Sequence, residues 1–126
     1  MNEKKVKITI ILGVLFGLFI IWAVGSSYIY KLRKETFKVK VPQTLSIYGS
    51  QIEDVYVEGL YVCVYVNAAG YKNADKSVQE AWKKEVVTLI RMDAIETELL
   101  KNGYITVSFY AGKGSTERLG LYQIEE

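Results

Sequence analysis

The sequence predicts an α+β protein in which a single N-terminal transmembrane helix precedes a small antiparallel sheet packed on one long helix. Three observations predict this class: an uncharged apolar run near the N-terminus, period-two alternation in several short segments, and one long helical pattern between those segments. The expected order is strands, helix, strands, with about four to five strands. We divide the 126-residue chain into a short basic tail (1–7), the apolar helix (8–30), a basic juxtamembrane segment (31–40) and a folded domain (41–126).

The apolar run contains no charged residue over 23 positions, 8–30. As a helix it would be roughly 35 Å long, enough to cross a hydrocarbon core of about 30 Å. Trp22, Tyr28 and Tyr30 gather at its C-terminal end, where aromatic rings favour the headgroup level. A secretory signal cleaved after Gly25 has a similar pattern, but the length of the run favours an uncleaved signal-anchor. The cleaved, secreted form is the alternative.

The orientation in the cell membrane depends on two opposing arguments. Three lysines and the amino terminus lie before the apolar run, and five basic residues lie at 31–40, so the count alone favours a cytoplasmic C-terminal domain. However, translocating a seven-residue tail with three lysines is unfavourable. We therefore expect a single-pass protein whose C-terminal domain lies outside the cytoplasm.

Gly13 and Gly17 have the GxxxG spacing that lets two transmembrane helices approach closely. This spacing predicts a homodimer contact through the transmembrane helix. The alternative is that glycine is simply common in membrane helices.

The folded domain begins with segments that alternate with period two. In FKVKV, Phe37, Val39 and Val41 fall on one face of a predicted strand, and Pro42 then interrupts it. The turn Glu58-Gly59 predicts either a hairpin or one long strand bent at the glycine. The predicted strands are 37–41, 52–57, 60–66, 104–110 and 119–124, and 45–48 is a further short candidate.

The helical pattern covers about 78–101 and follows a loop at 68–75. Ser77-Val78-Gln79-Glu80 resembles a capping box at its start, and Asn102-Gly103 is a good C-terminal cap. Asp93 and Glu96 interrupt its apolar stripe and resemble a second start signal, which predicts a bend near Asp93.

Charge and composition exclude several function classes. From Val41 onward the chain has eight basic and twelve acidic residues, so the folded part has no basic excess for a nucleic-acid partner. With no histidine and one cysteine, the chain lacks the ligands of zinc, copper and haem sites and the usual Ser/His and Cys/His nucleophile systems. We therefore expect no cofactor and no metal, and we expect Cys63 to be a small buried side chain.

Two patterns that suggest chemistry have simpler explanations. AGKGST (111–116) lacks the upstream glycine and the Ser/Thr directly after Lys113 that a phosphate-binding loop needs, and a strand follows it. The acidic groups Glu53-Asp54, Glu58 and Asp93/Glu96 lie in turns or near helix ends, where carboxylates are common. A carboxylate-dependent envelope enzyme is a further alternative.

Tyrosine is the distinctive enrichment, with ten residues in the chain. Period two places Tyr61 and Tyr65 opposite the valines of 60–66, and Tyr104 and Tyr110 opposite Ile105 and Val107. The aliphatic face should receive the helix, which leaves a tyrosine face suited to a protein interface. The alternative is that cross-strand tyrosine pairs only stabilise the sheet.

Together these observations predict a membrane-anchored, non-catalytic interaction or accessory module of a cell-envelope assembly. Its expected partners are the bilayer, an envelope protein that contacts the tyrosine face, and a second copy through Gly13 and Gly17.

Overall fold

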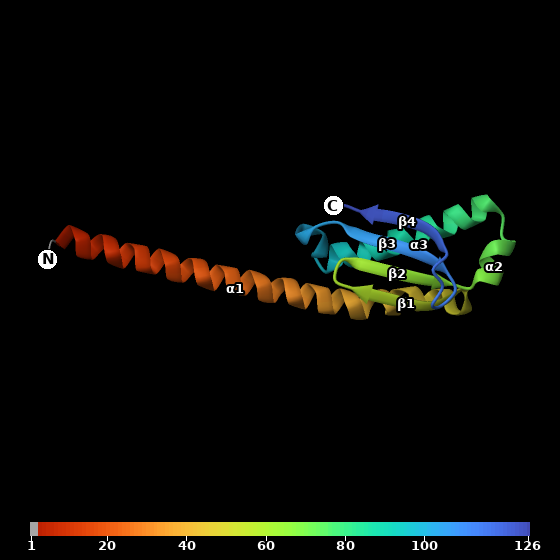
Figure 1. Ribbon diagram of the computed structural model, residues 1–126, viewed down its shortest axis with the longest axis horizontal. Helices are drawn as coiled ribbons and strands as arrows, with labels where there is room; N and C mark the ends of the chain where they lie inside the picture. Colours follow the sequence, from red (N-terminus) through yellow and green to blue (C-terminus); the bar gives the residue numbers. More distant parts are fainter. Residues whose placement is uncertain (1–2) are drawn as a thin grey trace. The chain divides into compact units, whose positions relative to one another are not determined.

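A computed structural model describes residues 3–126 and confirms the α+β class (Figure 1). Residues 1 and 2 of the predicted basic tail lie outside the described residues. The chain divides into two compact units, Met1–Leu32 and Arg33–Glu126. In order, the elements are α1 (Glu3–Leu45), the 3₁₀ helix η1 (Ser46–Gln51), β1 (Ile52–Glu58), β2 (Tyr61–Val66), α2 (Ala68–Asn73), α3 (Lys76–Glu96), the 3₁₀ helix η2 (Leu99–Asn102), β3 (Ile105–Ala111) and β4 (Arg118–Ile124).

The first unit is helical throughout its described residues and belongs to α1. Within residues 3–126, one helix is long and apolar enough to cross a membrane; its most apolar window has a mean hydropathy of 2.6, and none of that window is buried. A signal sequence near an N-terminus passes the same test of length and composition. The predicted helix at 8–30 is therefore confirmed as a helix, and both the anchor and the cleaved signal fit it.

The four strands form one mixed sheet in the order β1-β2-β3-β4. The pairs β1/β2 and β3/β4 are antiparallel, whereas β2 and β3 are parallel. The predicted all-antiparallel sheet is thus wrong at its centre. The helix α3 lies between β2 and β3 in the sequence and returns the chain to the end of the sheet where β2 began, so β3 runs parallel to β2. The hairpin at Glu58-Gly59 is confirmed, with Gly59 at a φ of 56° in the left-handed region that glycine tolerates.

Two helices, and not one, cover the aliphatic face of the sheet. Figure 1 shows α3 and the last turns of α1 on the same side of the four strands. Phe37, Val41 and Leu45, four residues apart, are fully or almost fully buried, whereas Val39 is 61% exposed. The predicted strand at 37–41 is therefore wrong: helical spacing accounts for the burial, and the period-two alternation over five residues was a coincidence.

α1 continues to Leu45 although it contains Pro42. A proline removes one backbone donor and crowds the preceding turn. Val41 and Leu45, buried on either side of it, hold this turn against the sheet. Ser46–Gln51 then forms η1, so the weak strand predicted at 45–48 is also wrong.

Two basic residues of the segment 31–40 form ion pairs within the domain. Arg33 pairs with Glu98 at 3.2 Å and donates to Asn102, and Lys40 pairs with Glu96. These contacts join the end of α1 to the end of α3 and to η2. The second unit therefore includes most of the segment that we assigned to the membrane flank.

α3 differs from its prediction at both ends. It starts at Lys76 after the N-cap Asp75, and Glu80 pairs with Lys83 at 2.9 Å, so the capping box at Ser77 is wrong. It ends at Glu96, close to the bend predicted near Asp93. Glu98 then adopts left-handed backbone and η2 follows. The loop predicted at 68–75 contains the short helix α2.

Candidate functional site

The two faces of the sheet differ sharply in composition. Residues paired across strands share a face, so the strand register sorts the side chains into rows. On the helix-covered face, the rows contain Val55, Val64, Phe109 and Gly120, and Val57, Val62, Val107 and Tyr122. Trp82 of α3 packs on Phe109 from this side, with ring centroids 6.0 Å apart.

The other side of the sheet, which we call the open face, has no helix over it in Figure 1. Its residues form three rows of four, each with one residue from every strand. The first row is Asp54, Tyr65, Tyr110 and Arg118; the second is Tyr56, Cys63, Ser108 and Leu121; the third is Glu58, Tyr61, Thr106 and Gln123. The open face therefore has aromatic and small side chains at its centre and charged groups on its edge strands.

Three of the four predicted tyrosines make one cluster on this face. The rings of Tyr65 and Tyr110 stack with centroids 5.6 Å apart. The Tyr61 hydroxyl donates to Ser108 Oγ at 3.1 Å and lies 3.3 Å from the Tyr110 hydroxyl. These rings surround the centre of the face, where Cys63 and Ser108 are buried. The expectation of a small buried cysteine is confirmed.

The cluster changes the acidity of its phenols. The hydrogen bond with Ser108 lowers the pKa of Tyr61, but the hydrogen bond with Tyr110, the nearby Cys63 and burial outweigh it and raise that pKa to about 12. Burial also raises the pKa of Tyr65, with Cys63 adding to it. These hydroxyls are therefore neutral hydrogen-bonding groups at physiological pH.

Tyr104, the fourth predicted tyrosine, lies apart from the cluster. It precedes β3 and is 54% exposed, and within residues 3–126 no hydrogen bond or ring contact joins it to the other three. Two exposed members of the face were missed: Tyr56 at 48% and Leu121 at 50%. A two-residue turn at Gly59 and Leu60 would have predicted the pairing of Tyr56 with Cys63, since it fixes the register of both strands.

Charge is distributed unequally between the two edge strands. β1 contributes Asp54 and Glu58, and β4 contributes Arg118, which is exposed and has no ion-pair partner within residues 3–126. Asp54 is 45% exposed at its side chain; its Oδ1 accepts from the Val55 amide, and its Oδ2 lies 4.0 Å from Lys113 Nζ. Glu58 accepts a hydrogen bond from the Tyr56 hydroxyl.

Gly13 and Gly17 lie in the first unit, on α1. A Cβ added at either position would meet nothing within 4 Å in this single chain. Both glycines thus leave open helix surface, and the predicted contact between helices stays a prediction.

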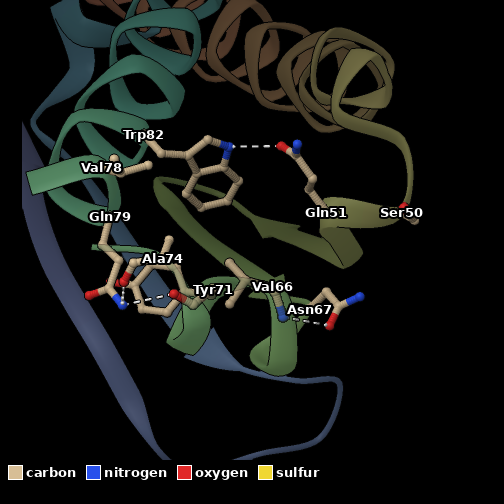
Figure 2. A pocket seen from close by; sticks show the side chains of 10 residues that line it. Ser50, Gln51, Val66, Asn67, Tyr71, Ala74, Val78, Gln79 and Trp82 are labelled. Carbon is tan, nitrogen blue, oxygen red and sulfur yellow. Dashed lines mark hydrogen bonds between the residues drawn. The ribbon is translucent and has the colours of Figure 1, made fainter. Parts of the chain in front are cut away.

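A cleft of about 330 Å³ lies on the helix side, between α2, the start of α3 and the end of η1 (Figure 2). Trp82 Nε1 donates to Gln51 Oε1 at 3.1 Å, and Gln79 Nε2 donates to the carbonyl oxygens of Tyr71 and Ala74 at 2.7 and 3.1 Å. These bonds fasten α2 and η1 to α3. None of the ten lining residues is charged, so the lining offers no carboxylate for acid–base chemistry.

The carboxylates that we considered for catalysis are dispersed. Glu53 accepts from the Lys113 amide at 2.8 Å and ties the β3–β4 loop to β1, and Glu96 pairs with Lys40. Asp93 is buried in α3, and its Oδ2 has no hydrogen-bond partner among residues 3–126. Within residues 3–126, no group of three or more His, Cys, Asp or Glu side chains could hold a metal ion.

No protein-family model, no curated protein and no solved structure matches this chain.

Proposed function

We propose that this chain is a single-pass, membrane-anchored interaction module of a cell-envelope assembly, that it is not catalytic, and that the open face is its contact surface. The observation that carries the proposal is the row structure of that face. Register places Tyr56, Tyr61, Tyr65, Tyr110 and Leu121 together while the helices cover the opposite face. Aromatic side chains at the centre and charged side chains at the rim are typical of protein interfaces.

The anchor in this proposal is the apolar part of α1. Its uncharged run covers 23 residues, longer than the core of an ordinary signal peptide. The proposal places the domain outside the cytoplasm, because the basic N-terminal tail resists translocation. Protease added to intact cells should then digest residues 33–126, and protection of the domain until lysis would reverse this placement.

Capture of partners from membranes tests the contact surface. Tyr56→Ala and Leu121→Ala remove two exposed side chains of the open face, so they should reduce capture at least tenfold while changing stability by about 0.5 kcal/mol or less. Met92→Ala on α3, which is 59% exposed, is the matched control and should leave capture unchanged. Equal capture by all three variants would remove the open face from the proposal.

A further inference from the structure

We infer that the partner of the open face is a second copy of this chain, related to the first by a two-fold axis that runs parallel to the strands. The inference rests on the proposed function, since it names the occupant of the same surface. It follows from the placement of charge and apolar side chains across the three rows.

The two-fold axis would run along the strands midway between β2 and β3, in the plane between the two sheets. Rotation about it places β1 of one copy over β4 of the other and keeps each row opposite itself. Asp54 then faces Arg118 of the second copy, and Arg118 faces the second copy's Asp54. One pair of side chains on a single chain thereby supplies two opposite-charge contacts, as a two-fold interface requires.

The remaining positions are compatible with the same arrangement. Tyr65 lies opposite Tyr110 in the first row, so two rings meet between the central strands. In the second row Tyr56 lies opposite Leu121, so an aromatic and an apolar side chain meet between the edge strands. In the third row Glu58 lies opposite Gln123, whose amide can donate to a carboxylate. Two sheets that pack face to face keep their strands within about 30° of each other, which preserves the match between rows.

Charge distinguishes this arrangement from the other two-fold arrangement. An axis perpendicular to the strands places β1 over β1 and reverses the row order. Asp54 would then face Glu58 of the second copy, and the exposed Arg118 would face Gln123. Two acid–acid contacts would replace two acid–base contacts, so electrostatics favours the axis parallel to the strands.

The size of the face explains why the anchor matters. Four strands about 4.8 Å apart and six or seven residues long offer a flat area of about 400 Å² per copy. A standard protein interface buries about 800 Å² per partner, so this contact is weak in dilute solution. Confinement of both copies to one membrane raises their effective concentration, which makes the full chain in a bilayer the right sample.

An exchange of charges between chains tests the inference. Full-length chains labelled with donor or acceptor dyes are reconstituted in phospholipid vesicles, all with Gly13→Ile so that the GxxxG contact does not contribute. The chain that carries only Gly13→Ile, which is the parent of this series, should give energy transfer. Asp54→Arg alone and Arg118→Asp alone should each weaken dimerisation at least tenfold, because both intermolecular pairs become repulsive in each homodimer.

Mixing the two variants gives the decisive reading. A heterodimer of Asp54→Arg with Arg118→Asp restores both opposite-charge pairs, so energy transfer should return to the parent level. The double variant Asp54→Arg/Arg118→Asp should likewise dimerise alone. Lys84→Asp and Glu126→Arg, exposed and outside the rows, are the matched controls and should not respond to mixing. If Asp54→Arg melts early, Gln123→Glu serves as a second test, because its homodimer has two acid–acid contacts with Glu58 and should be weak. Mixing it with Glu58→Arg leaves one opposite-charge pair and one Glu58–Gln123 contact, so energy transfer should return.

Two results would overturn the inference: single variants that dimerise like the parent, or a mixture that stays as weak as its components. If, in either case, Tyr56→Ala still reduces capture of a different protein, the proposed function stands. Only the inference that the partner is a second copy is then wrong. If Tyr56→Ala loses nothing either, the open face is not a contact surface and both fail.

Discussion

Tyr61 links the hydrogen bonds of the open face to a measurable pH dependence. Its raised pKa, about 12 against 10 for an ordinary phenol, means that the folded domain favours the neutral hydroxyl. The resulting stabilisation is fully present below pH 10 and is lost as the pH rises towards 12. Melting curves between pH 9 and 11.5 should therefore fall more steeply for the parent chain than for Tyr61→Phe. Parallel curves would mean that the Tyr61 hydroxyl does not make these hydrogen bonds.

For single residues, the sequence predicted which face of the sheet a side chain lies on. It did not predict how far that side chain is buried. Period two correctly placed Tyr61, Tyr65 and Tyr110 on one face, because the pleat alternates regardless of what packs on it. It did not reveal that Tyr65 and Tyr110 are half-buried against each other. It also placed Tyr104 with them, although β3 begins only at the next residue.

α1 is the element whose secondary structure the sequence predicted least accurately. FKVKV fits a strand and a helix equally well over five residues, and only burial decides between them. Phe37, Val41 and Leu45 recur every four residues, which is a helical signal that becomes visible only when the segment is read beyond Pro42. The strands 52–57, 60–66, 104–110 and 119–124 were predicted within one residue at most of their ends, since each is longer and bounded by turns.

Val39 and Val41 provide a matched test of the helical end of α1. In a strand both would face the core, but in the helix Val41 is fully buried while Val39 is 61% exposed. Val41→Ala should cost roughly 2 kcal/mol of unfolding free energy from lost burial and a residual cavity. Val39→Ala should change it by about 0.5 kcal/mol or less. Chemical denaturation of the two variants measures both values, and equal losses would favour the strand.

At the scale of the whole molecule, topology was beyond what the sequence could predict. The parallel pairing of β2 with β3 depends on where α3 delivers the chain, and no local pattern encodes that contact. The consequence for function is direct, because this pairing aligns Tyr65 with Tyr110 and completes the rows from β1 to β4. An all-antiparallel sheet would carry the same residues in different neighbourhoods.

The proposed function requires that the open face contacts protein when the chain is in its membrane. A photoreactive benzoylphenylalanine in place of Tyr56, 48% exposed on the open face, probes that contact. The same residue in place of Met92, 59% exposed on α3, is the matched control. After illumination of intact membranes, position 56 should give a discrete protein adduct and position 92 should give none. Adducts from position 92 alone, or none from position 56, would contradict the proposed contact surface.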